Sequence, residues 1–238
     1  MTDSDKSLDI LGIKPVADAV SVVTTATTAG IGAFLSRICL PAAEEYGLLL
    51  RDKVGAWRAQ NAIAIATKAE TKLRRLSNPD GRHAHPRLVG AVIENGSWIE
   101  DDFLQEMWAG LLASGCTEDG QDQLNVIFST SLAQLTPAQA KVLQFACEKC
   151  QKIRSTSGLA VPKVLIISVA EVLEVAGISD VHSMDLQLDH LRGIGLLDIA
   201  SGLNPDAEMA NLCPTALGLQ LFIRSEGFLG SPLEYFGL

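Results

Sequence analysis

The residues of this chain that could do chemistry are few and widely spaced. Cys147 and Cys150 form a single CxxC pair, a spacing that occurs in zinc sites and in redox-active dithiols. A zinc ribbon needs a second pair, and a redox motif needs a βαβ context, so packing inside a helix is the preferred interpretation. His83 and His85 could bind a metal only together with distant partners. We therefore expect neither a metal nor a cofactor.

Acid–base chemistry has one candidate, the acidic run Glu100-Asp101-Asp102. It directly precedes an apolar helical pattern, and acidic side chains stabilise the N-terminus of a helix. Helix capping is therefore the preferred role. The sequence has no GxSxG nucleophile elbow, no glycine-rich phosphate loop and no HExxH zinc motif. We predict that the protein is not an enzyme.

Charge is distributed unevenly along the 238 residues, whose net charge is −9. Residues 1–90 carry 12 basic and 9 acidic side chains, whereas residues 91–238 carry 7 and 19. The larger part of the molecule would repel a polyanion, so DNA is not the expected partner. Five cysteines, an odd number, and an acidic start without an apolar signal core favour a cytoplasmic protein.

The elements that position these residues are mainly helices. After a polar start at 1–12, hydrophobic spacing predicts a helical domain over residues 13–133. Its longest helix runs from Pro41 to about Ser77, because small and apolar residues recur there every three or four positions. A turn-rich segment at 77–86 follows, and further helices are predicted at about 87–94, from about 102, and at 123–133.

The second half of the chain is organised by helix caps. Capping boxes at Thr136–Gln139 and Ser168–Glu171 each begin a helix, and a third helix at 181–193 follows a glycine-containing turn. Two strands, at 196–200 and 209–213, would flank a polar loop at 201–208, and a last helix would end near Ser225. This order predicts a winged-helix domain, helical with a small β-hairpin, over residues 134–227, followed by an apolar tail at 228–238.

The third helix of a DNA-binding winged helix would contact bases, yet here its predicted outward positions are mostly acidic or neutral. We therefore predict that this helix, the acidic run and the aromatic tail serve protein contacts. For the tail, the first interpretation is packing back onto its own domain, and a docking segment for a partner or a second copy is the second. The outward positions are His182, Asp185, Gln187, Asp189 and Arg192, and the candidate contact residues are Asp101, Asp102, Glu106, Asp185, Asp189, Phe228, Tyr235 and Phe236.

A membrane-perturbing function is one alternative. Residues 19–36 contain no charged side chain, and this length lies at the lower limit for crossing a bilayer. Their threonine, serine and glycine content favours close helix packing, but activation could release residues 19–40 toward a membrane. A further alternative is a nucleic-acid-binding regulator that uses the basic face at 51–87. The candidate residues for a membrane or anionic partner are Phe34, Arg51, Lys53, Arg58, Arg74 and Arg75.

Three short motifs suggest a family. They are His85-Pro86-Arg87-Leu88, the segment WAGLLA at 108–113, and Leu135-Thr136, and they lie within matching stretches at 41–69, 85–115 and 128–145. Together these stretches resemble the abortive infection alpha (Abi-alpha) family of bacterial proteins. The resemblance implies a role in defence against phage and supplies no catalytic residues. We expect a protein partner, either a phage component or a second defence protein, and self-association is a further expectation.

Overall fold

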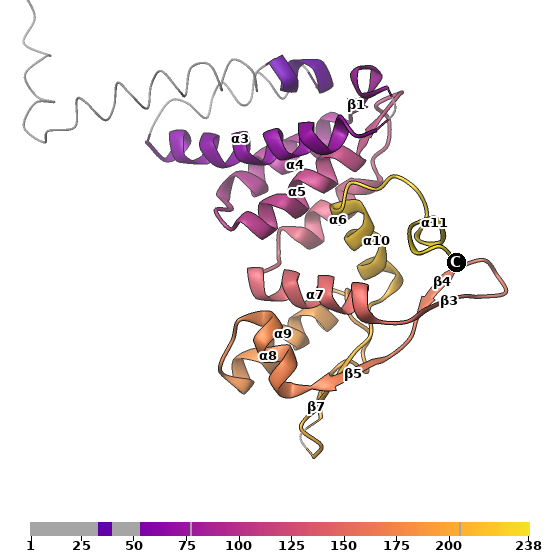
Figure 1. Cartoon of the computed structure of the whole chain (residues 1–238). Coiled ribbons are helices and arrows are strands. Elements are labelled where there is room, and N and C mark those ends of the chain that lie inside the picture. The colour runs from indigo at the N-terminus through magenta and orange to yellow at the C-terminus, as the bar shows by residue number, and fades with distance from the viewer. Residues whose placement is uncertain (1–32, 40–52, 77, 205) are drawn as a thin grey trace, which may run out of the picture.

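The computed structural model describes residues 33–39, 53–76, 78–204 and 206–238 (Figure 1). The described part is mainly helical, as predicted, with three small antiparallel sheets. Residues 33–38 are helical. Most of the uncharged stretch at 19–36, the start of the predicted long helix, Arg51 and the side chain of Lys53 lie outside the described residues.

Besides residues 33–38, the described N-terminal part contains four α-helices, each of which overlaps a predicted helix. His85 caps the second of them, because its Nδ1 accepts a hydrogen bond from the backbone N–H of Arg87 at 3.2 Å, and Pro86 occupies the first helical position. Two strands of two residues each, one before this helix and one after the next helix, pair with each other. The elements are α3 (Lys53–Leu73), β1 (His83–Ala84), α4 (Pro86–Asn95), α5 (Asp102–Ser114), β2 (Cys116–Thr117) and α6 (Leu124–Leu132).

The C-terminal part contains the capped helices in the predicted order, together with more strands than predicted. Thr136, Ser168, Asp180 and Thr215 each accept a hydrogen bond from a backbone N–H of the first helical turn. The elements are α7 (Pro137–Lys149), β3 (Lys152–Arg154), β4 (Ala160–Pro162), β5 (Leu165–Ser168), α8 (Val169–Ala176), α9 (Val181–Gly193), β6 (Gly202–Asn204), β7 (Met209–Leu212), α10 (Ala216–Ser225) and α11 (Pro232–Phe236).

Of the strand predicted at 196–200, only an isolated antiparallel bridge between Leu197 and Pro214 is present. Leu196 and Leu197 are buried at the end of α9, where their N–H groups both donate to the carbonyl of Leu191, so this segment completes the helix end. The carboxylate of Asp198 accepts a hydrogen bond from the N–H of Ala200, which stabilises a turn at these residues. The first strand of the hairpin is therefore β6, which lies in the predicted loop, and β7 pairs with β6 on one side and with β5 on the other.

One hydrophobic core runs through both parts of the molecule. It contains residues of α3, α4 and α5 together with residues of α7, α8, α9 and α10. Helix α10 connects the two parts, because it packs against α5, α6 and α7 (Figure 1). The approach of α10 to α5 is close: a Cβ atom added to Gly110 would lie 1.6 Å from the carbonyl oxygen of Ser225. The predicted domain boundary near residue 133 stays a prediction.

Candidate functional site

The exposed face of α9 is acidic and apolar, and we call it the α9 face. It comprises Val181, His182, Asp185, Leu186 and Asp189, all exposed. Leu186 is 67% exposed although it is a large hydrophobic side chain in the middle of a helix. Val181 and Leu186 are both exposed among carboxylates, which makes this face a candidate for contact with a partner.

Two residues that were predicted to point outward from α9 turn back onto the domain. Gln187 accepts a hydrogen bond from the hydroxyl of Thr136 at 2.9 Å. Arg192 donates to the carbonyl of Ser201 at 2.9 Å and pairs with Asp189. The prediction for Gln187 and Arg192 is therefore corrected. Because Arg192 is the one arginine of α9, these contacts leave the exposed face without a guanidinium that could meet a phosphate.

A hollow of about 450 Å³ borders this face. It lies between the beginning of α8, the beginning of α9 and the hairpin of β6 and β7. Val181 connects it to the α9 face, and Glu208 places a carboxylate at its edge. Most of the lining is apolar, so the hollow could accept an apolar side chain from another molecule. The lining residues are Ser168, Val169, Ala170, Leu173, Val181, Leu203, Asn204 and Glu208.

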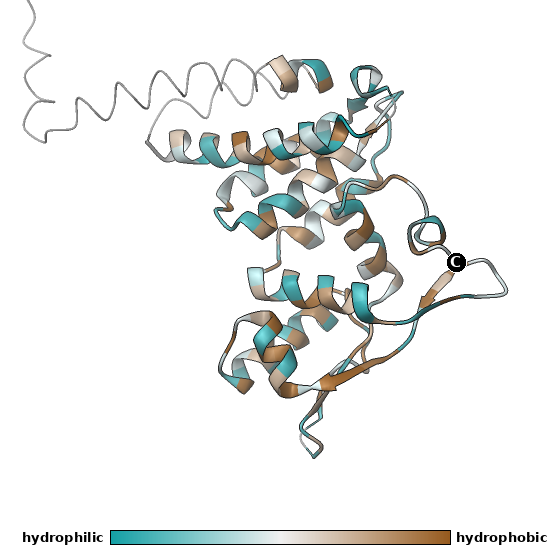
Figure 2. Ribbon diagram, in the orientation of Figure 1, coloured by the Kyte–Doolittle hydropathy of each residue, from teal (hydrophilic) through white to brown (hydrophobic). Residues whose placement is uncertain are grey.

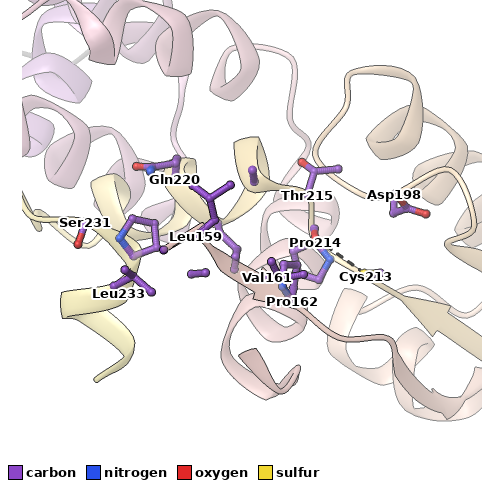
Figure 3. Close-up of a pocket in the computed structure, with 15 residues that line it drawn as sticks. Leu159, Val161, Pro162, Asp198, Cys213, Pro214, Thr215, Gln220, Ser231 and Leu233 are labelled. Atoms are coloured by element: carbon purple, nitrogen blue, oxygen red, sulfur yellow. Dashed lines mark hydrogen bonds between the residues drawn. The ribbon is translucent and has the colours of Figure 1, made fainter. Parts of the chain in front are cut away.

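A second, larger groove of about 540 Å³ lies between the hairpin of β3 and β4, the start of α10 and the C-terminal segment (Figure 3). Three of its polar side chains already have partners. The hydroxyl of Thr215 donates to the carbonyl of Gly195 at 2.5 Å and caps α10, while Ser231 caps α11. The carboxylate of Asp198 accepts a hydrogen bond from the N–H of Ala200. Among the described residues that line this groove, none is a nucleophile hydrogen-bonded to a base.

The predicted acidic and basic patches of the N-terminal part lie against each other. Asp101 caps α5 through the N–H of Leu104 at 2.9 Å, as its position predicted. Asp102 pairs with Lys68, and Glu106 lies 3.1 Å from Lys72. These pairs neutralise the charges along the contact between α3 and α5, so a partner that binds there must compete with pairs already formed.

The remaining residues predicted for a membrane or anionic partner are mostly engaged. Arg58 donates to the hydroxyl of Ser97 at 3.0 Å, and its guanidinium lies 4.4 Å from the ring centroid of Trp98. Arg74 pairs with Glu70 at 2.9 Å, whereas Arg75 is exposed. Phe34 is 4% exposed and belongs to the core. In residues 33–39, 53–76, 78–204 and 206–238, no helix has the length and hydropathy needed to cross a bilayer.

The two cysteines of the CxxC pair lie in the hydrophobic interior. Cys147 and Cys150 are buried, and the thiol of Cys147 donates to the carbonyl of Gly218 at 3.7 Å. Burial raises the pKa of both thiols, that of Cys147 well above its usual range, so both remain protonated at neutral pH. In the described part of the chain, no three His, Cys, Asp or Glu side chains gather closely enough to hold a metal ion.

The aromatic tail packs onto its own domain, the first of its two interpretations. Phe228 lies 5.2 Å from Tyr235 between ring centroids, and Phe222 of α10 lies 5.7 Å from Tyr235 and 6.3 Å from Phe236. Helix α11, which was not predicted, holds this arrangement. The missed signal was the sequence Ser231–Glu234, a capping box with proline at the first helical position, which is the same pattern that correctly predicted α7.

A model of the abortive infection alpha family matches residues 58–212 of this chain. The chain belongs to that family. The match runs from α3 through β7 and therefore includes the α9 face and the hollow beside it. It ends before α10 and the tail. Neither a curated protein nor a solved structure matches the chain.

The motifs that suggested the Abi-alpha family have structural roles in this fold. His85 and Pro86 begin α4, and Leu88 is fully buried. Trp108 lies in the centre of the core. Thr136 caps α7 and also bonds α9 through Gln187. These Abi-alpha motifs therefore explain how the fold is held, and the exposed residues of α9 are the stronger candidates for binding.

Proposed function

We propose that this Abi-alpha protein is a cytoplasmic phage-defence protein that works through protein contacts and not through catalysis. Family membership supports the defence role. The single observation that carries the contact mechanism is the α9 face, where Val181 and Leu186 are exposed beside Asp185 and Asp189. The partner, a phage component or a second defence protein, would present a basic and apolar surface.

A winged-helix assignment of the C-terminal part belongs to this proposal. Its support is the order α7, β5, α8, α9, β6, β7, with β7 central in a three-stranded sheet. In DNA-binding helix-turn-helix modules, the helix in the position of α9 enters the major groove. Here the carboxylates of Asp185 and Asp189 would meet phosphate groups of like charge. The same scaffold therefore favours a protein partner.

The test is a charge reversal at the centre of the α9 face. Asp185 is exposed, and its carboxylate makes no hydrogen bond or ion pair within the described residues. Asp185→Lys should therefore leave the fold intact. We expect this variant to lose at least about tenfold of the protection that the wild type gives a bacterial culture against phage, because reversed charge opposes a basic partner. Plating efficiency of the phage measures the effect.

The matched control is Glu118→Lys, which makes the same charge change at an exposed acid near β2. It should retain full protection at equal cellular abundance. Full protection by Asp185→Lys at normal abundance would show that the α9 face is not the contact surface.

A further inference from the structure

The hairpin of β3 and β4 exposes an unusual amount of apolar surface. It projects from the C-terminal part (Figure 1), and Ile153 and Val161 lie opposite each other across its two strands. Leu159, next to the tip, is 64% exposed, and Ile166 of β5 is 63% exposed. Figure 2 shows hydrophobic colour along β5, the strand that runs into α8. We call Ile153, Leu159, Val161 and Val164, which lie in or next to the hairpin, the hairpin surface.

Basic side chains surround this apolar surface, although the second half of the chain is strongly acidic. Four of the seven basic residues in 91–238 lie in or beside the hairpin, namely Lys149, Lys152, Arg154 and Lys163. Lys152 is held by its own molecule, with its Nζ 4.3 Å from the ring centroid of Phe236. Lys149, Arg154 and Lys163 are exposed, and no ion pair to them occurs in the described ranges.

The α9 face has the complementary character. Exposed acids surround its apolar residues, and the hollow beside Val181 offers space for an apolar side chain. The protruding hairpin surface is apolar with basic neighbours, and the α9 face is apolar with acidic neighbours. The exposed acids of α8, α9 and the β6–β7 hairpin are Glu171, Glu174, Asp180, Asp185, Asp189, Asp206 and Glu208.

We propose that the hairpin surface of one copy docks on the α9 face of a second copy. The hairpin and the α8–α9 pair lie on opposite sides of the C-terminal part (Figure 1), so one chain cannot join its own two surfaces in this fold. The contact is heterologous. Each added copy leaves one hairpin surface and one α9 face free, and assembly continues until a ring closes or a filament forms.

This inference rests on the proposed function in one respect, that the α9 face is a protein contact. It adds a further partner for that face, a second copy of this chain, besides a phage component or a second defence protein. A few apolar side chains and solvent-exposed charges make a small interface, so we expect a dissociation constant on the order of 10 μM in dilute buffer. The attraction between exposed charges is screened by salt, so assembly should decrease as the salt concentration rises.

The test is sedimentation velocity of the purified full chain. We expect the weight-average sedimentation coefficient to rise with protein concentration in about 50 mM salt and to fall toward the monomer value in about 500 mM salt. Two variants each remove one surface: Arg154→Glu with Lys163→Glu on the hairpin, and Asp185→Lys with Asp189→Lys on α9. Each should weaken self-association by at least tenfold. Lys141→Glu, at an exposed position of α7, is the matched control and should assemble like the wild type.

Mixing the two variants tests the pairing itself. The hairpin variant retains an intact α9 face and the α9 variant retains an intact hairpin, so an equal mixture should associate although each variant alone stays monomeric. Wild-type protein that stays monomeric at both salt concentrations overturns the proposal, as does a mixture that fails to dimerise. Phage protection separates the two proposals. If the wild type is monomeric and its protection still depends on Asp185, the α9 face is a contact surface but its partner is not a second copy.

Discussion

At the level of single residues, Cys147 and Cys150 have a spacing that suggests metal or redox chemistry, while their surroundings keep the thiols buried and protonated. The carbonyl of Gly218 accepts a hydrogen bond from the Cys147 thiol. The protein interior also excludes the water that would stabilise a thiolate. Cys116 is in a similar position, since burial raises its pKa to about 12. The function of these side chains is to fill space in the core.

A pH dependence of stability follows from these thiols. Unfolded cysteines ionise near pH 9, whereas folded Cys116 keeps its proton until about pH 12. The folded state then binds more protons than the unfolded state, so the free energy of unfolding should fall as pH rises above 9. Within that window Cys116 contributes a slope of up to about 1.4 kcal/mol per pH unit, and Cys147, whose pKa is also raised by burial, contributes in the same direction.

Urea unfolding at several pH values between 7 and 10.5 measures this slope. The double variant Cys116→Ala with Cys147→Ala should lose the part of the slope that the thiols contribute, whatever its stability at pH 7. An unchanged slope in the variant would contradict the assignment.

At the level of elements, the position of α10 depends on a missing side chain in α5. Any Cβ on residue 110 would overlap the carbonyl of Ser225, so the two helices can approach this closely only because Gly110 is a glycine. The neighbouring hydrogen bond from the Ser114 hydroxyl to the carbonyl of Arg224, at 2.9 Å, requires the same separation. Packing and hydrogen bonding therefore fix one arrangement of α5 and α10.

Gly110→Ala tests this close contact. We expect it to lower the free energy of unfolding by about 3 kcal/mol, since overpacking must push α10 away from α5. Gly90→Ala is the control, because a Cβ there meets no atom within 4 Å in the middle of α4. It should raise stability by about 0.5–1 kcal/mol through helix propensity. Equal effects of the two substitutions in denaturant unfolding would show that the contact does not limit the packing.

The elements also show what local sequence can predict. Thr136 and Ser168 mark their helices correctly because a cap depends on residues three positions apart. The strand predicted at 209–213 is present as β7, but its pairing with β5 joins residues distant in the chain, so the sequence did not indicate β5. The local hairpin of β3 and β4 was also missed. The outward position was predicted correctly for Asp185 and Asp189. It was predicted wrongly for Gln187, because only the fold brings Thr136 to that side chain.

At the level of the whole molecule, the continuous core affects how the chain unfolds. The sequence predicted two domains, and a core shared through α10 makes them depend on each other. All three tryptophans lie in the N-terminal part, at positions 57, 98 and 108. Tryptophan fluorescence therefore reports on the N-terminal helices, whereas far-ultraviolet circular dichroism reports on helices throughout.

We expect the two signals to give one coincident unfolding transition in urea, because neither part keeps its core when α10 leaves. A second transition that is visible by circular dichroism alone would show that the C-terminal part unfolds independently. Gly110→Ala offers a further comparison, since loosening α10 should shift both signals together.

The place of α10 in the chain has a consequence for biosynthesis. The ribosome makes this helix after α5, α6 and α7, on which it packs, so the surface of α5 around Gly110 stays open while these earlier helices emerge. A nascent or prematurely ended chain lacks the segment that joins its two halves. Completion of the fold is therefore delayed until translation has passed residue 225, and fragments that stop earlier should be substrates for cellular proteases.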